Sequence, residues 1–210
     1  DKADGATMWD KVEVYSPEAN LGPTAHYDVN NSQAAGEQND YAYLTAVGGK
    51  SLQWSGEGVH HFYAMYPSSE VFADLPDYNT LQQGVKMNGT TLMGTIPAVQ
   101  NPSKVTNTDG NYVFEPDMRY AYMAAKSSAT IEDETVSLNF VPIVTAIKLT
   151  FTASQEIKIA EIRVTGDDII GDFTADLSET SWTGTYPVCT NDATKSGDVI
   201  TVSAWQEDAS

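Results

Sequence analysis

Cysteine is almost absent from this chain of 210 residues, which contains Cys189 alone. A single thiol cannot close an intrachain disulfide or complete a structural zinc site, so packing must hold the fold together. Basic residues are also scarce, because 11 Lys and Arg stand against 29 Asp and Glu, for a formal net charge of −18. Such a surface repels phosphate backbones and anionic leaflets, so we expect neither nucleic-acid binding nor polybasic docking to a membrane.

Long apolar runs are missing as well. No stretch approaches the roughly 18 consecutive apolar residues of a membrane-spanning helix. The hydrophobic share of 41% is nevertheless that of a folded chain, and the length suits one large domain or two small ones. The polar start, Asp1 to Gly5, has no signal-peptide pattern, which leaves two alternatives open: a cytosolic protein or a removed leader.

Helical periodicity is scarce, whereas short runs with period-two alternation recur from end to end, and these predict an all-β chain. The pattern is clearest in Thr135 to Val141 and in Thr145 to Thr152. Their alternate apolar side chains should face a core; these are Val136, Leu138, Phe140, Ile147, Leu149 and Phe151. Further strands are predicted at Lys11–Tyr15, Tyr41–Val47, His60–Tyr66, Thr90–Ile96, Tyr120–Ala125, Ile157–Val164 and Val199–Ala204. A short helix is expected within Ser68–Gln83.

Pro142 falls between the two clearest strands. Proline cannot donate to a sheet ladder, so the strand ending near Val141 should stop there or lie at a sheet edge. We place a domain boundary at this point, with one antiparallel β-sandwich over residues 1–145 and another over residues 146–210. The second piece offers few strands for its length, so we expect that domain to be small or incomplete.

The three histidines do not form a chelating pair in the sequence. His60 and His61 are adjacent on a predicted strand, so His61 should share a face with Tyr63, and His60 should share the other face with Phe62. His26 stands alone in a polar segment. A hydrogen-bonded structural histidine explains each of them more simply than a metal ligand or a catalytic base.

Other candidate sites are equally weak. Cys189 has no basic residue within five positions, so a buried or incidental thiol is favoured over a nucleophile. Residues 107–111 faintly resemble half of a calcium loop, but the bidentate Glu is missing and a hairpin turn explains them better. Asp167-Asp168 similarly predicts a turn between strands. Asn88-Gly89-Thr90 matches a glycosylation sequon, a triplet that is common by chance.

Local motifs of enzymes are missing. The sequence has no nucleophile elbow, zinc-protease helix, phosphate-binding loop or dinucleotide fingerprint. We therefore expect no enzyme, no catalytic residues, no cofactor and no metal site.

Aromatic residues are numerous, with 11 Tyr, 4 Trp and 6 Phe. Such rings could form a sugar-binding platform, for which Trp54 and Trp182 are the first candidates. These two and Trp205 lie where the strand pattern is weaker. Most of the others fall inside strand patterns, where core packing is the usual explanation; these are Phe62, Tyr63, Tyr66, Tyr120, Tyr122, Phe140 and Phe151. A core role is thus favoured over a binding platform.

Several segments, taken together, resemble a known family. They are, in order, Trp54, His61-Phe62-Tyr63-Ala64-Met65-Tyr66-Pro67, Gly94-Thr95-Ile96-Pro97-Ala98-Val99-Gln100, Tyr122-Met123-Ala124-Ala125, Val136-x-Leu-x-Phe140-x-Pro142-x-x-Thr145-Ala146, Ile162-x-Val164-x-Gly166 and Gly171-x-Phe173. In order and spacing this set resembles the fimbrillin-like family of Bacteroidetes cell-surface proteins, over roughly residues 50–175. Many members carry a His after the Leu-x-Phe strand, where this chain has Pro142, which places it in a variant branch.

The resemblance implies two β-sandwich domains of transthyretin-like topology in a secreted lipoprotein. It implies a non-enzymatic structural and adhesive role as a subunit, anchor or tip of a type V pilus, at the cell surface, in the outer membrane or in a fimbrium, after removal of a leader. The implied partners are other pilus subunits, joined by donor-strand exchange, and a host or glycan ligand. Membrane attachment would then come only from a lipid anchor outside this chain.

Maturation in that family removes an N-terminal strand after an arginine. The only arginines here are Arg119 and Arg163, both in predicted strands, so either the chain begins after such a site or it is an unprocessed anchor or tip protein. Two other classes stay open. A surface carbohydrate-binding module would need exposed coplanar aromatic rings, and a hydrolase would need paired carboxylates in a cleft.

Overall fold

Strands dominate the regular secondary structure of the described residues. The structure is a computed structural model that describes residues 10–30, 41–73, 84–106, 112–115, 118–152, 154–155, 159–178, 182–183, 186–194 and 196–203. Its strands are β1 (Lys11–Tyr15), β2 (Thr24–Asn30), β3 (Tyr43–Ala46), β4 (His60–Tyr66), β5 (Gly84–Asn88), β6 (Thr91–Ile96), β7 (Val99–Gln100), β8 (Ser103–Thr106), β9 (Tyr112–Glu115), β10 (Met123–Ala129), β11 (Val141–Pro142), β12 (Glu161–Asp176), β13 (Trp182–Thr183), β14 (Tyr186–Pro187), β15 (Cys189–Asn191) and β16 (Gly197–Ser203). The described residues also contain three 3-10 helices: η1 (Val47–Gly49), η2 (Ser69–Phe72) and η4 (Met118–Tyr120). The all-β prediction is confirmed.

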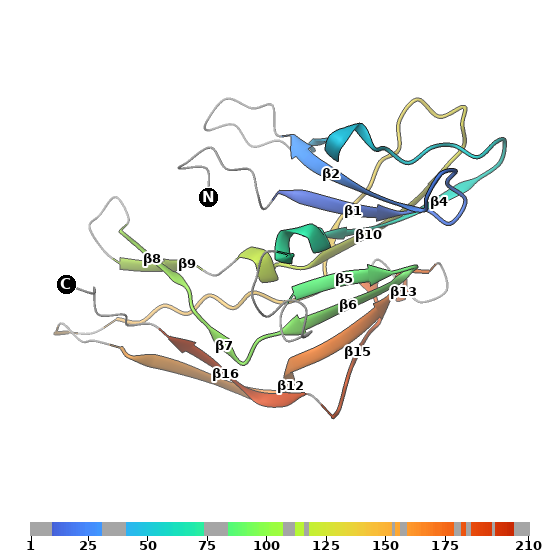
Figure 1. Cartoon of the computed structure of the whole chain (residues 1–210). Helices are drawn as coiled ribbons and strands as arrows, with labels where there is room; N and C mark the ends of the chain where they lie inside the picture. Colours follow the sequence, from blue (N-terminus) through green and yellow to red (C-terminus); the bar gives the residue numbers. More distant parts are fainter. Residues whose placement is uncertain are drawn as a thin grey trace.

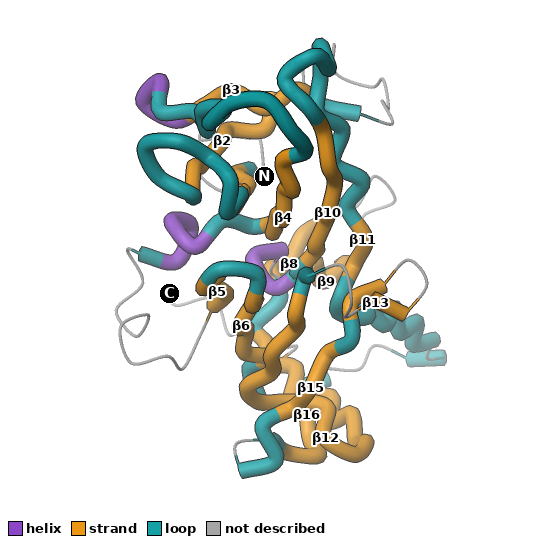
Figure 2. Tube along the Cα trace, turned by 90° about the vertical axis from the view of Figure 1, so that its right-hand side faces the viewer, coloured by secondary structure: helices purple, strands orange, loops and turns teal. Residues whose placement is uncertain are grey.

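Two sheets lie one above the other in a β-sandwich (Figure 1). The first sheet has the strand order β11-β10-β4-β1-β2-β3, and the second has the order β5-β6-β12-β16-β7 with β15 also paired to β12. A view turned by 90° shows the same stacking (Figure 2). Pairing between the described strands is antiparallel except between β16 and β7, and β8–β9 and β13–β14 form separate two-stranded ladders.

The main core lies between the two sheets. β4 contributes Tyr63 and Met65 from the first sheet, and β12 contributes Phe173 and Ala175 from the second. A Cβ added at Gly94 would lie 2.5 Å from the Phe173 ring, so only glycine lets that ring sit against the neighbouring strand. This close approach is one reason why β6 and β12 can pair where a large aromatic ring is buried.

The first sheet is covered on its other face too, which we call the outer face. A second cluster of buried residues lies there: Val12, Val14, Phe62, Ala64, Ala125 and Ala129. Partly buried side chains from irregular segments pack over it, and they include Leu52, Trp54, Leu138 and Phe140. Alternation along β4 therefore divides its side chains between two apolar clusters, as period two requires.

Most of the predicted strands are present. Lys11–Tyr15 and His60–Tyr66 are confirmed with the bounds expected from the sequence, as β1 and β4. β3, β6, β10, β12 and β16 overlap their predictions with shifted ends. The helix expected within Ser68–Gln83 is the short η2, while residues 74–83 lie outside the described part of the chain.

The two clearest predictions of strands are wrong. Residues 135–140 and 145–152 belong to no strand, and of the first segment only Val141 enters a ladder, in β11. Period-two alternation reports which side chains share a face, but strand formation also needs a neighbour with free backbone groups. Pro142 lies in the edge strand β11, as its missing N–H predicted.

The turn predicted at Asp167-Asp168 is also wrong. These residues do not form a turn between two strands but lie inside β12, where its register with β16 shifts between Thr165 and Ile170. Asp168 has a φ of 52°, a left-handed conformation that Asp tolerates better than most residues, so the irregularity bends one long strand without ending it.

The sheets do not follow the predicted domain boundary. The second sheet takes β5, β6 and β7 from before residue 145 and β12, β15 and β16 from after it. The division into residues 1–145 and 146–210 stays a prediction about independent folding units.

Candidate functional site

Residues 145–152 form an unusual surface within the described part of the chain. Every residue of this segment is exposed, and its alternate apolar side chains Ile147, Leu149 and Phe151 are 64%, 48% and 55% exposed. Among the described strands none pairs with the segment, and Figure 1 draws it as a trace without an arrow. An apolar stripe at strand spacing therefore lies outside both sheets, on a segment that has no ladder partner among the described strands.

The start of this segment is anchored in the fold. Ile143 and Val144 pack against the main core, and the Ile143 N–H donates to the carbonyl of Tyr122 at 3.0 Å. Beyond Val144 the chain leaves the core. The exposed stripe thus projects from a fixed point rather than from a free end.

The edges of the first sheet differ in how open they are. β11 closes one edge with two residues, one of them Pro142, which blunts that edge against further pairing. β3 forms the other edge, and the exposed rings of Tyr41 and Tyr43 meet there edge to face, with centroids 5.8 Å apart. No described strand pairs with the outer side of β3, so this edge could receive another chain.

His60 and His61 point to opposite faces, as predicted. The ring Nδ1 of His61 lies 2.9 Å from Glu18 Oε1, and the His61 backbone N–H donates to Glu18 Oε2 at 3.0 Å. Burial acts to raise the pKa of Glu18, but the hydrogen bonds from His61 outweigh it and hold that pKa below its usual value. This pair links β4 to the β1–β2 connection, and no local signal announces it because 43 positions separate the partners.

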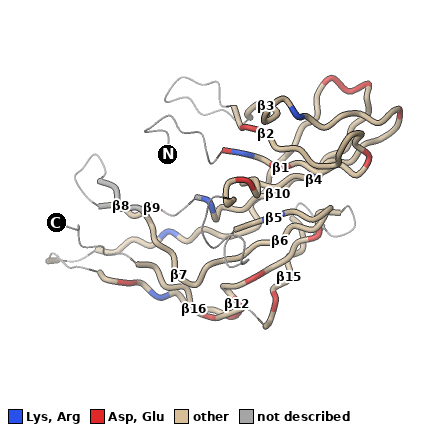
Figure 3. Tube along the Cα trace, in the orientation of Figure 1, with Lys and Arg blue, Asp and Glu red and all other residues tan. Residues whose placement is uncertain are grey.

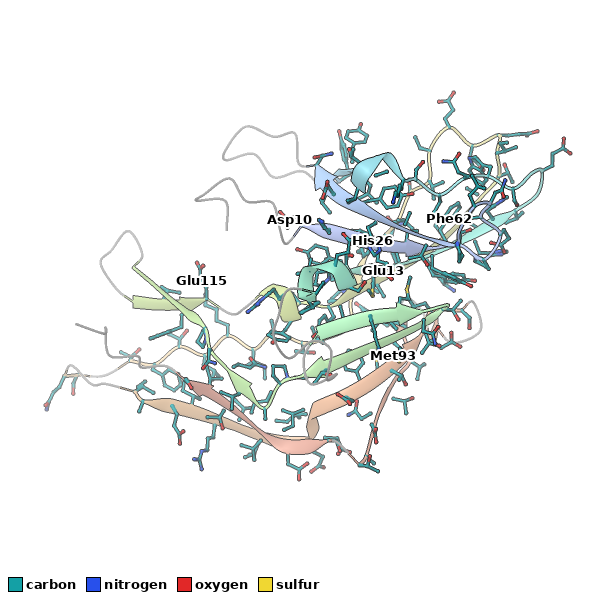
Figure 4. All side chains as sticks on the ribbon, viewed as in Figure 1. Asp10, Glu13, His26, Phe62, Met93 and Glu115 are labelled. Carbon is teal, nitrogen blue, oxygen red and sulfur yellow. The ribbon has the colours of Figure 1, made fainter. Side chains whose placement is uncertain are left out.

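His26 is not isolated in the folded protein. Its Nδ1 lies 2.8 Å from Ser68 Oγ and 3.8 Å from Glu13, and its Nε2 lies 3.8 Å from Glu70. Figure 4 shows His26 beside Glu13. Ser68 is completely buried and its Oγ accepts the N–H of Glu70 as the cap of η2, so this group ties η2 to the first sheet and does not present a hydroxyl to solvent.

The remaining candidates are scattered over the surface. Cys189 is exposed on β15, where partial burial of its sulfur raises its thiol pKa. Asn88 is exposed at the hairpin between β5 and β6. Residues 107–111 lie outside the described residues, but β8 and β9 on either side pair as an antiparallel hairpin. Within the described ranges no three His, Cys, Asp or Glu side chains gather as a metal site.

The candidate aromatic platform residues are placed differently from one another. Trp54 is half-buried and meets the rings of His60 and Phe62 edge to face, with centroids 4.6 Å and 5.8 Å away. The side chain of Trp182 and the whole of Trp205 lie outside what the structure describes. The expected core role is confirmed for Phe62, Tyr63 and Tyr122 but is wrong for the exposed Phe151; Tyr66, Tyr120 and Phe140 are partly buried against the two clusters.

Acidic residues are spread over both sheets, with few basic ones between them (Figure 3). No helix in the described part of the chain is long and apolar enough to cross a membrane. Comparison of the chain with protein-family models, with curated proteins and with solved structures finds no match.

Proposed function

We propose that this chain is a fimbrillin-like structural protein of the cell surface, a subunit, anchor or tip of a pilus that assembles by β-strand addition through residues 145–152. The observation that carries the proposal is the stripe of Ile147, Leu149 and Phe151, exposed at strand spacing on a segment without a ladder partner among the described strands. The segments that resemble the fimbrillin-like family support the same role.

The physical reason is the cost of leaving this segment uncovered. Unpaired N–H and C=O groups at strand spacing are a template for pairing with another chain, and an exposed apolar stripe adds a hydrophobic driving force. A partner strand would satisfy both at once. Backbone pairing would give affinity, and the alternate side chains would fix the register.

Salt should matter little to such assembly. Lys148 is the only charged side chain between Thr145 and Thr152, so pairing there depends on backbone hydrogen bonds and apolar burial rather than on ion pairs. A net charge of −18 makes copies of the chain repel one another. Higher ionic strength screens this repulsion, so added salt should favour assembly slightly and should not oppose it.

The carbohydrate-binding alternative named Trp54 and Trp182 as its first candidates. Trp54 is half-buried and meets the rings of His60 and Phe62 at nearly right angles, so part of its ring already contacts aromatic neighbours within the protein. Carbohydrate binding stays a prediction.

The test uses synthetic peptides that span the terminal strands of the full-length precursor. A peptide that pairs with residues 145–152 should raise the midpoint of thermal unfolding by roughly 5 to 10 °C when it is saturating. The triple variant Ile147→Thr, Leu149→Thr, Phe151→Thr keeps a high strand propensity but removes the apolar stripe, so it should lose this response.

A matched control changes the other side of the same segment. The double variant Lys148→Thr, Thr150→Ser leaves the stripe intact and should respond to the peptide as the unmodified chain does. If no peptide stabilises the unmodified chain, or if the triple variant responds equally, assembly through residues 145–152 is wrong.

A further inference from the structure

A pocket of about 210 Å³ opens on the outer face of the first sheet. Val14, Tyr27, Leu44 and Phe62 form its floor from four adjacent strands, β1 to β4. The opposite wall comes from two irregular segments that cover this face, one with Leu52 and Trp54 and the other with Val136 and Leu138. Protein interiors are normally filled to crystal-like density, so an apolar space of this size between a sheet and its cover is suited to an occupant.

Tyr27 brings a free donor to this pocket. Its hydroxyl oxygen accepts the backbone N–H of Leu52 at 3.0 Å, which fixes the ring beneath the covering segment. A phenolic hydroxyl can accept and donate at the same time, and no described residue accepts the Tyr27 proton. The hydroxyl can therefore donate to a ligand without losing the contact that positions it.

His60 adds a second donor to the lining. The Ser55 backbone N–H donates to His60 Nε2 at 3.2 Å, so in the neutral ring the proton is on Nδ1. His60 is only 3% exposed, and among the described residues its Nδ1 has no hydrogen-bond partner. An unpaired buried N–H is costly, and a ligand acceptor that reached this nitrogen would remove that cost.

The chemistry of the lining limits what the pocket can hold. None of the described residues that line it is Asp, Glu, Lys or Arg, so an ion would be buried without a counter-charge. A sugar would bury several hydroxyl groups against mostly apolar walls. By size, a cavity of about 150 Å³ holds benzene, so about 210 Å³ accommodates one substituted ring.

We infer that this pocket binds a neutral, compact molecule of one aromatic ring that carries a carbonyl or similar acceptor oxygen. The ring packs among Tyr27, Trp54 and Phe62, and the oxygen accepts from Tyr27 and, after a small adjustment of the covering segment, from His60. The site is separate from residues 145–152, none of which lines it. Ligand binding and strand addition can therefore succeed or fail independently.

The test compares four probes by calorimetry and by the NMR signal of the Trp54 indole. Acetophenone should bind, and toluene, which lacks the acceptor, should bind about fivefold more weakly. Benzoate should bind at least about tenfold more weakly than acetophenone because its charge would be buried. Methyl glucoside should not bind.

Variants identify the residues that hold the probe. Tyr27→Phe keeps the ring and removes the hydroxyl, so acetophenone should lose most of its advantage over toluene while toluene binds as before. Val136→Phe, or Gln53→Trp if that variant does not fold, fills the pocket from its rim and should abolish binding of both probes. Val99→Thr, on the second sheet, is the matched surface control.

Each remaining outcome overturns the inference. Absence of acetophenone binding at millimolar concentration would show that the space is only a packing defect. Undiminished binding in both rim variants would place the probe elsewhere. Tighter binding of benzoate or of methyl glucoside would show that the ligand class is wrong.

Discussion

Two segments with the same sequence pattern end in opposite environments. Residues 135–140 and 145–152 both alternate apolar and polar side chains, and neither belongs to a strand. In the first, Leu138 and Phe140 lie against the outer face of the first sheet and are partly buried. In the second, Ile147 and Phe151 are mostly exposed.

The difference lies in what the chain finds beside each segment. The outer face already offers an apolar cluster around Phe62 and Ala64, so Leu138 and Phe140 can be partly buried there without making a ladder. Residues 145–152 leave the core after Val144 and meet no described apolar face. Alternation thus encodes a side that can be buried, whereas the neighbouring surface determines whether it is buried.

The largest expected effect is the difference in unfolding free energy between two Phe→Ala variants, one in each segment. Phe140→Ala should lower the free energy of unfolding by about 2 to 3 kcal/mol, because full burial of a Phe gives about 3 to 5 kcal/mol and Phe140 is partly buried. Phe151→Ala should change it by less than about 0.5 kcal/mol, because that ring is exposed. Urea titrations of the isolated chain measure both values, and equal losses would contradict the contrast between the segments.

Alkaline pH should weaken the side of the fold that residues 135–140 cover. Burial, together with the hydrogen bond from its hydroxyl to Asp10 at 3.1 Å, raises the pKa of Tyr66 to about 12. In the unfolded chain the Tyr66 hydroxyl ionises near pH 10. The stability that its buried, protonated form contributes to the fold is therefore complete below pH 10 and is lost as the pH rises towards 12.

Urea midpoints measured between pH 9 and pH 12 would show this loss. Tyr66→Phe cannot ionise at this position, so its stability should fall less steeply over the same interval. Parallel curves for the two proteins would remove Tyr66 as the cause.

Acid should weaken the contact between β4 and the β1–β2 connection without affecting residues 145–152. The pKa of Glu18 is lowered in the folded state, so the stability from the Glu18–His61 pair is present above pH 4.5 and is lost as the pH falls through the folded-state pKa. Glu18→Gln should flatten this part of the pH profile of unfolding. Hydrogen exchange of the His61 amide, which donates to Glu18, gives a local readout.

The smallest effects should come from polar residues of both segments. Asn139→Ala and Thr150→Ala remove exposed side chains, so each should change the free energy of unfolding by less than about 0.5 kcal/mol. A large loss for Asn139→Ala would mean that the polar side of residues 135–140 is the one that packs. A urea titration of Phe140→Ala under the same conditions gives the loss of unfolding free energy expected for a side chain that does pack.

Local pattern was sufficient to predict much of the fold. The alternation in His60–Tyr66 predicted both the strand and the division of its side chains, with Tyr63 on one face and Phe62 on the other. Pro142 predicted an edge because its missing N–H is a property of the residue itself. The lack of helical periodicity likewise predicted the all-β class.

The contacts that define the sites could not be read from the sequence in the same way. His26 and Ser68 are 42 positions apart, and His61 and Glu18 are 43 apart, so only the folded chain brings them together. The pocket is similar, because its floor comes from four strands and its cover from two distant segments.

The amino-acid sequence by itself determined the class of the fold, the faces of its clearest strands and the acidic surface, because these depend on residue type and on spacing along the chain. Tertiary structure alone decided which alternating segment is covered, where the outer-face pocket opens and that strands from before and after residue 145 share one sheet. Those outcomes depend on which surfaces meet. A side chain is buried only when a second surface covers it, and the sequence of one segment specifies its own apolar side but not the surface that packs against it.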